Sequence, residues 1–403
     1  MRLVLAVSLA ALFGCGGGGS AQPETPRVET PKAVAEFTTI DLNTIDNYAR
    51  PTLPAHFNRQ VLADDNSPET NRLEDKIATL GRVLFYDKRL STNDTVACAS
   101  CHRQSNGFTD SQRFSKGVDG STLTSAHSMR LANLRFFKPG SMFWNRRATS
   151  VEALVSEPLQ APSEMGWDSA AGGMPALLTK MRSLSYYPPL FAFAFGDGSI
   201  SEQRVQNALA QFLRAMVSYN SRWDIGYAQI YKPDKDERLL LMENLPNLTE
   251  QENTGRMRFM ARGVNNMGLG CAECHVPPTF GLVADSKSNG LDPDETTVFK
   301  VPSLRNAAIT GPYMHDGRFA TLVEAIRHYQ SPKMGPALDR RLKKAILIPE
   351  SPFSANLVPT GFEVPQGIGF GGEADIEAIA AFLATLTDST LLTDPRFSDP
   401  FRR

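Results

Sequence analysis

The chain has 403 residues and a formal net charge of −1 at pH 7, because 42 lysines and arginines nearly balance 43 aspartates and glutamates. This balance argues against a nucleic-acid-binding protein, which would present a strongly basic surface. Beyond its first residues the chain has no apolar stretch long enough to span a bilayer. Its length is sufficient for two domains.

Residues 1–15 have the pattern of a secretory signal peptide, with Arg2 followed by an apolar segment over residues 3–13. The end of this segment, Leu12-Phe13-Gly14-Cys15, resembles a bacterial lipobox, in which cleavage before the cysteine accompanies attachment of lipid to its sulfur. An ordinary signal peptide that is cut a few residues later is the alternative. Either pattern predicts an exported protein on the periplasmic side, and a lipid on Cys15 would be its membrane anchor.

Residues 16–37 are expected to form a flexible tether, because glycines and then a Pro/Glu/Thr-rich stretch cannot bury a core. Residues 38–230 are expected to form an N-terminal domain, and residues 231–403 a C-terminal domain. The boundary is placed where Tyr231-Lys-Pro-Asp-Lys-Asp-Glu interrupts the helical pattern.

Two C-x-x-C-H motifs stand far apart in the chain: Cys98-Ala-Ser-Cys101-His102 and Cys271-Ala-Glu-Cys274-His275. This spacing is the attachment signature of c-type haem, in which both cysteines form thioethers with the porphyrin and the histidine ligates the iron. A thioredoxin-like redox pair and a zinc site of four cysteines are the alternatives, but neither needs the histidine. Because only Cys15 remains, no disulfide framework is expected. The motifs predict two covalent haem c groups.

The rest of the pattern is helical, without convincing alternating strands. Residues 202–219 carry Val205, Leu209 and Phe212 at helical spacing, and another amphipathic helix is expected over residues 376–386. Capping boxes are expected at Ser199-Ile-Ser-Glu202, at Thr249 with Glu252, and at Thr321 with Glu324. These features predict a mainly α fold of two cytochrome-c-like domains, each with one covalently bound c-type haem.

Five further segments stand in a fixed order around the two motifs. They read Leu80-Gly-Arg-Val-Leu-Phe-Tyr-Asp-Lys-Arg-Leu-Ser91, Phe143-Trp144-Asn-Arg-Arg-Ala148, Pro158-Leu-Gln-Ala-Pro-Ser-Glu-Met-Gly166, Phe299-Lys-Val-Pro-Ser-Leu-Arg-Asn306 and Gly311-Pro-Tyr-Met-His-Asp-Gly317. In this order they resemble the bacterial di-haem cytochrome c peroxidase and MauG family, over about residues 70–390.

This resemblance implies that the first haem, held by His102, is the peroxide site and that its opposite face is open. Glu164 then matches the family's distal glutamate, which moves a proton between the two peroxide oxygens. A carboxylate in a largely apolar pocket suits this task, because burial tunes its pKa. Trp144 matches the tryptophan that lies between the two haems and relays electrons. A surface glutamate and a core tryptophan are the alternatives.

The resemblance also places Tyr329 opposite His275, where peroxidases of the family carry a ligating methionine and MauG-like members carry a tyrosine. A hard phenolate favours ferric and higher oxidation states of iron. A tyrosine packed in the core is the alternative, since Tyr329 shares a helical face with Ile326. Met334 lies close enough in the sequence to be a rival ligand.

His127 stands where the family has an asparagine that contributes to an inter-haem calcium site. Histidine is a poor ligand for a hard cation, so calcium is doubtful. His127 could instead ligate the first haem iron, or pack and donate hydrogen bonds. No histidine lies between Phe108 and Ala126, where family members with a closed first haem carry one.

Three functions follow from these features. The first is a cytochrome c peroxidase that reduces hydrogen peroxide to water with electrons from a small cytochrome c or cupredoxin. The second is a MauG-like enzyme that oxidises residues of a partner protein through a high-valent bis-iron state. The third is a di-haem electron carrier. The resemblance also allows a homodimer, although no segment of the sequence shows its interface.

Overall fold

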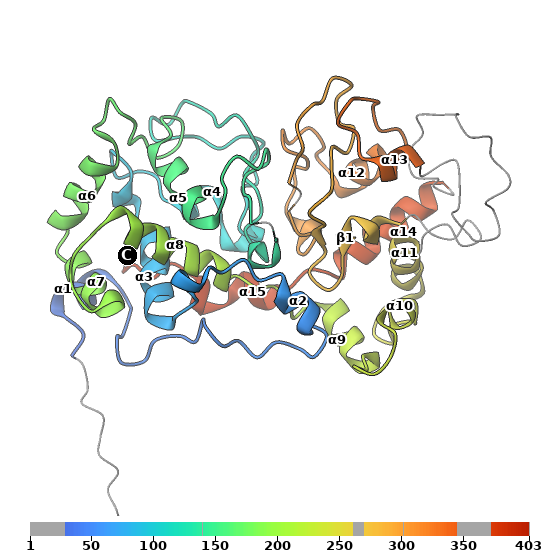
Figure 1. Ribbon diagram of the computed structural model, residues 1–403, viewed down its shortest axis with the longest axis horizontal. Helices are drawn as coiled ribbons and strands as arrows, with labels where there is room; N and C mark the ends of the chain where they lie inside the picture. Colours follow the sequence, from blue (N-terminus) through green and yellow to red (C-terminus); the bar gives the residue numbers. More distant parts are fainter. Residues whose placement is uncertain (1–28, 139, 261–269, 301, 345–371, 403) are drawn as a thin grey trace, which may run out of the picture.

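The computed structural model describes residues 29–138, 140–260, 270–300, 302–344 and 372–402. The predicted signal peptide, the lipobox with Cys15 and most of the predicted tether lie outside these residues. Two lobes stand side by side in Figure 1, the first coloured blue to green and the second yellow to orange. Within the described residues, no helix combines the length and apolarity that crossing a membrane requires.

Helices make up nearly all of the regular structure. Up to residue 215 they are α1 (Lys32–Phe37), α2 (Arg59–Ala63), α3 (Asp75–Tyr86), α4 (Cys98–Cys101), α5 (Val151–Gln160), α6 (Gly173–Ser183), α7 (Tyr187–Phe195) and α8 (Glu202–Ala215). The later helices are α9 (Arg222–Ile230), α10 (Glu237–Leu240), α11 (Glu250–Met260), α12 (Leu322–His328), α13 (Arg340–Lys344), α14 (Glu373–Ala384) and α15 (Ser389–Thr393). The short strands β1 (His275–Val276) and β2 (Gly281–Leu282) pair antiparallel.

The first lobe is built around α3 and α8, which pack closely along their length. A Cβ atom at Gly81 would lie 2.0 Å from the carbonyl oxygen of Ala208, so only glycine allows this approach. The predicted helix over residues 202–219 is observed, but it ends at Ala215. The N-cap residue of α8 is Ser201, and not Ser199 as expected. The Ser201 side chain accepts a hydrogen bond from the Arg204 backbone N–H. Apolar burial and capping therefore fix α8 against α3.

The second lobe repeats this arrangement with α11 against α14. At Gly255, a Cβ would lie 1.8 Å from the Ala378 carbonyl oxygen. The expected capping boxes are confirmed: Thr249 caps α11 through Glu252, and Thr321 caps α12 through Glu324. The predicted helix near residues 376–386 is α14.

Two boundaries and the place of the C-terminal segment differ from the expectation. Val34 of α1 is buried in the first core cluster, so the tether ends before Lys32 and not at residue 37. Trp223 of α9 belongs to the second core cluster, so the chain passes from the first core to the second before residue 223 and not at residue 230. Leu391 and Phe397 return to the first cluster, and α15 crosses under the first lobe (Figure 1). The C-terminal segment therefore ties the two lobes together.

The lobes also share an internal repeat. Residues 142–148 and 313–319 form matching turns, because Met142 bridges Ala148 just as Tyr313 bridges Phe319. The residue after the first bridging position has a positive φ in both turns, 66° in one and 73° in the other. A side-chain-capped helix follows each turn, α5 in the first lobe and α12 in the second. Trp144 and His315 therefore occupy equivalent positions.

Candidate functional site

The first C-x-x-C-H motif forms the one-turn helix α4 and the residue that ends it. His102 donates its backbone N–H to the Cys98 carbonyl at 2.9 Å. The Nδ1 atom of its ring lies 2.9 Å from the carbonyl oxygen of Phe108, a buried residue with φ of 60°. This contact assigns the proton to Nδ1 and leaves Nε2 free to ligate a metal. Burial lowers the pKa of His102, which favours the neutral ring that ligation needs.

The second motif lies in a 3-10 turn, Cys271–Glu273, that leads into β1. His275 pairs with Leu282 in the two-stranded sheet, and burial lowers its pKa to about 4. Its Nδ1 atom is buried without a hydrogen-bond partner in the described part of the chain. The nearby Phe280 backbone raises the pKa of the ring and so offsets part of the effect of burial. Cys274 packs against the core of the first lobe, so the second motif borders the contact between the lobes.

The residues around the two motifs fit haem. The four thiols of the motifs are free, as thioether formation requires. Arg130, Arg146 and Lys300 lie near one another, and within the described ranges none has a carboxylate partner. Burial lowers the pKa of Lys300 to about 8 and that of Arg130 to about 10. Buried cations need compensating anions, and the two propionates of a haem would supply them.

Glu164 lies in the loop between α5 and α6 and is partly buried. Its backbone carbonyl accepts from Val118 at 2.9 Å, and its N–H donates to Ala161 at 3.0 Å, so the loop is held on both sides. Burial raises the pKa of its carboxyl, Arg147 opposes this and Glu157 adds to it. Burial also raises the pKa of Cys98 and Cys101, and the Glu164 charge adds to both shifts. The structure thus brings Glu164 to the first motif.

Trp144 lies at the contact between the lobes. Its indole Nε1 donates to the His127 carbonyl at 2.7 Å, and its own carbonyl accepts from the Lys300 N–H at 2.7 Å. Its ring meets His315 of the second lobe edge to face, with 6.4 Å between centroids. The tryptophan is therefore held between elements that follow the first motif and elements that follow the second, and not in the interior of either core.

Tyr329 is the C-cap residue of α12 and is partly buried. Burial raises the pKa of its phenol to about 12, Asn289 lowers it, and the thiols of Cys274 and Cys271 add to the rise. The phenol therefore faces the second motif. Its oxygen lies 3.4 Å from Nδ2 of Asn289, a weak contact that leaves the oxygen available to a metal. Met334, the rival ligand, lies partly buried in the loop after α12.

His127 is buried, and both of its ring nitrogens contact protein atoms. Nδ1 lies 3.1 Å from the Gln112 carbonyl oxygen, and Nε2 lies 3.4 Å from the Thr109 hydroxyl. Its neighbour Ser128 contacts the His102 ring, so His127 is on the ligating side of the first motif. These contacts support packing and hydrogen bonding by His127, and the alternative that this residue ligates iron stays a prediction. The nearby cations Arg130 and Lys300 also disfavour calcium here.

Sequence reasoning missed three residues of this region: Arg130, Arg146 and Lys300. A lysine or arginine in a sequence is normally read as solvated, so no local pattern showed that Lys300 is buried and that Arg130 and Arg146 are partly buried. His315 belongs to the Gly311–Gly317 segment of the resemblance, and the alignment of Met142–Ala148 with Tyr313–Phe319 makes it equivalent to Trp144.

Comparison with known proteins places the chain in a family. The family model described as di-haem cytochrome c peroxidase matches residues 75–230. The methylamine utilization protein MauG of Methylophilus methylotrophus is 32% identical over 278 residues, which cover 66% of this chain and 75% of that protein. The chain belongs to the di-haem cytochrome c peroxidase and MauG family.

Two further members show the range of this family. The cytochrome c551 peroxidase of Nitrosomonas europaea is 29% identical, over 62% of this chain and 71% of that protein. The crystal structure of a MauG-like protein associated with microbial copper homeostasis is 28% identical, with a TM-score of 0.64 over 87% of this chain and 99% of that one. Family membership confirms the predicted fold class and makes the chain a di-haem c-type oxidoreductase.

Proposed function

We propose that this family member is a MauG-like enzyme, which takes oxidising equivalents from hydrogen peroxide and removes electrons from residues of a partner protein. The partly buried phenol of Tyr329, which faces Cys271 and Cys274, carries this proposal. Bound haem supplies the iron at which peroxide is cleaved and at which oxidising equivalents are held. A phenolate ligand favours higher oxidation states of iron, so Tyr329 suits the second haem to share the oxidation.

Glu164 is proposed to handle the proton at the first haem. Hydrogen peroxide needs two electrons and two protons to become two molecules of water, and the first proton must move from the near oxygen to the far one. The ionised carboxylate accepts it and then releases it to the leaving oxygen. The raised pKa of Glu164 suits both steps, because the protonated and the ionised forms of the carboxyl are then closer in free energy near neutral pH.

Trp144 is proposed to couple the two haems. Its position between the lobes, with Nε1 fixed on the His127 carbonyl, holds the indole in one orientation. The ring of His315 lies beside it on the second lobe. An aromatic ring between two haems shortens each electron-transfer step.

An ordinary cytochrome c peroxidase is the second candidate, because the Nitrosomonas europaea relative carries that name. Its electrons would come from a small cytochrome c or cupredoxin through the second haem. Tyr329 favours the MauG-like function over this one. The electron-carrier alternative requires strong ligands on both faces of each iron, and the contacts of both His127 ring nitrogens with protein atoms argue against His127 as a ligand of the first.

One experiment separates the candidates. The fully oxidised holoprotein is mixed with hydrogen peroxide, and optical and Mössbauer spectra are recorded. A MauG-like enzyme reacts without prior reduction and holds two oxidising equivalents. An ordinary peroxidase of this family reacts only after one haem has been reduced, and an electron carrier reacts in neither state.

We also propose export to the periplasmic side, with a lipid on Cys15 as the anchor. The motif at residues 12–15 supports this, and attachment of c-type haem outside the cytoplasm agrees with it. Cells fed a radioactive fatty acid should label the wild-type protein but not Cys15→Ser. Equal labelling of the two would exclude Cys15 as the lipidated residue.

A further inference from the structure

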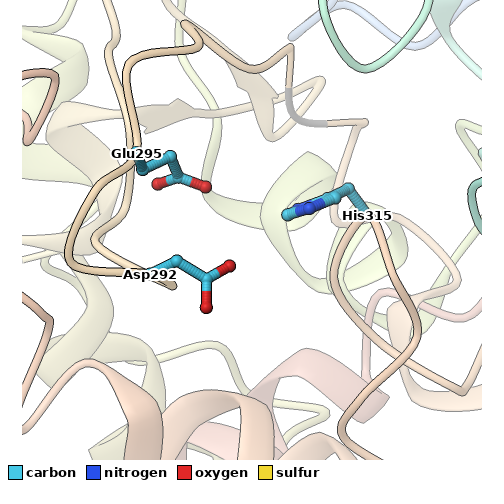
Figure 2. A group of neighbouring side chains, drawn as sticks. All are labelled: Asp292, Glu295 and His315. Atoms are coloured by element: carbon cyan, nitrogen blue, oxygen red, sulfur yellow. The ribbon is translucent and has the colours of Figure 1, made fainter.

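We propose that Asp292, Glu295 and His315 form a binding site for a divalent transition-metal ion such as zinc. One ligand atom from each residue can be chosen so that all three lie within 4.8 Å of one another. Figure 2 shows the two carboxylates and the imidazole directed toward a common space. The proposed peroxide chemistry assigns no proton transfer or haem ligation to these side chains, and the site does not depend on that chemistry.

Glu295 supplies the observation that points to a ligand. The residue is only 9% exposed, and its Oε1 atom is buried without a hydrogen-bond partner in the described part of the chain. The other oxygen, Oε2, accepts from the Ser288 hydroxyl. Burial and then the nearby Asp292 raise the pKa of this carboxyl to about 7. A buried carboxylate with an unused oxygen needs either a proton or a cation.

The local charges leave room for a cation. Asp292 pairs with Arg318 through both oxygens, at 2.9 and 2.8 Å. Arg318 also donates to Asp316 at 2.8 Å, so its charge is shared between two carboxylates. No cationic side chain forms an ion pair with Glu295 in the described ranges. Because each carboxylate oxygen has two lone pairs, Asp292 can keep Arg318 and also ligate an ion.

His315 makes this set of three ligands selective for a transition metal over calcium. Its ring stacks on Phe299, with 4.3 Å between centroids and 15° between planes, and neither ring nitrogen forms a hydrogen bond within the described ranges. Burial lowers the pKa of this ring, so a lone pair is available near neutral pH. Imidazole with carboxylates suits zinc and its first-row neighbours, whereas calcium takes oxygen ligands. Three protein ligands leave the fourth tetrahedral position to water.

The geometry needs only a small adjustment. Zinc binds nitrogen and oxygen at about 2.0–2.2 Å, so ligand atoms around it stand about 3–4 Å apart. Rotation of the exposed end of Asp292 closes the remaining gap. A bound ion would also fix the His315 ring, which lies edge to face against Trp144. The site would therefore steady the contact between the lobes.

Calorimetric titration of the chelator-treated, haem-loaded full chain with zinc chloride tests the proposal. We expect one equivalent of zinc to bind, and Glu295→Gln to weaken its affinity by at least about tenfold. His315→Gln, whose side chain is less buried, should do the same and covers the case in which Glu295→Gln fails to fold. Asp294→Asn is the matched control, because Asp294 is an exposed neighbour outside the cluster.

Three results would overturn the proposal. They are no zinc binding by the wild-type chain, unchanged affinity in a folded Glu295→Gln or His315→Gln variant, and calcium binding as tightly as zinc at this site. Unchanged haem absorbance and far-ultraviolet circular dichroism establish that each variant is folded. Because the readout is heat and stoichiometry, it stands whether or not the MauG-like function is correct.

Discussion

Trp144 and His315 meet edge to face across the contact between the lobes, with 6.4 Å between their ring centroids. Each is the second residue after a bridging position in one of two matching turns. The His127 N–H donates to the His315 carbonyl at 2.8 Å, and the Trp144 indole donates to the His127 carbonyl at 2.7 Å. One residue, His127, thus holds equivalent positions of the two lobes together.

Replacing Trp144 by phenylalanine should slow electron transfer between the haems. We expect peroxide to react with the first haem as before, but the response of the second haem to slow by about tenfold or more, equivalent to about 1.4 kcal/mol in activation free energy. Stopped-flow spectra of the two haems measure both rates. Trp223→Phe is the control, because the Trp223 Nε1 atom has no hydrogen-bond partner in the described chain and lies in the second core.

Glu164→Gln should lower the rate of reaction with peroxide by about 100-fold or more, because the amide cannot accept the proton. Haem content should not change, since Glu164 belongs to neither attachment motif. Glu157→Gln is the matched control: Glu157 lies on α5 and pairs with Arg147 at the surface. If Glu164→Gln reacts with peroxide at the wild-type rate, Glu164 has no part in the mechanism.

The same carboxyl predicts a pH dependence. Burial raises the pKa of Glu164 above its usual value of 4.5, and the ionised form is the base. The rate should therefore fall as the pH drops through this raised pKa, at a pH higher than an exposed glutamate would give. A pH profile of the peroxide reaction measures the midpoint, and Glu164→Gln should lack this limb. A midpoint at or below pH 4.5 would contradict the buried environment.

Tyr329→Met should convert the second haem toward the peroxidase type. A thioether favours ferrous iron where a phenolate favours ferric iron, so the midpoint potential of this haem should rise. The variant should also lose the ability to hold two oxidising equivalents without prior reduction. Spectroelectrochemical titration gives the potential. Val323→Met, on the same helix, is the control for an added thioether, and equal potentials in wild type and Tyr329→Met would show that Tyr329 does not ligate.

A buried ion pair joins the N-terminal segment to the second lobe. Asp224 contacts Arg305 at 2.5 and 2.6 Å and His56 at 2.9 Å. Burial alone would raise the pKa of Asp224, but Arg305 and His56 outweigh it and hold the pKa well below its usual range. Asp224→Asn should reduce the free energy of unfolding by about 3–5 kcal/mol, because Arg305 is left buried without a counter-charge.

The sign of the pH effect follows from this lowered pKa. The stabilisation by Asp224 is fully present above the unfolded value of about 3.9 and is lost as the pH falls toward the folded value. Denaturant melts at pH 7 and pH 4 should therefore both show the difference between wild type and Asp224→Asn. Asp236→Asn, at an exposed pair with Arg238, should leave the free energy of unfolding nearly unchanged.

Much of this molecule could be predicted because the determining patterns are local. Haem attachment depends on five consecutive residues, and each helix cap at Thr249 and Thr321 depends on four. Both patterns can therefore be recognised in the sequence. The boundary errors had a different cause: Val34 and Leu391 are buried by residues far away in the chain, which no local window contains. The burial of Lys300 and Arg130 was not predicted, for the same reason.

The most direct test of the proposed function is the stoichiometry of the reaction of the fully oxidised holoprotein with hydrogen peroxide. One equivalent of peroxide is added without any reductant, and the oxidising equivalents that remain are then counted by titration with a one-electron donor. The account predicts that two equivalents are held for each protein chain and that Tyr329→Met does not hold them. No reaction until one haem has first been reduced would contradict it.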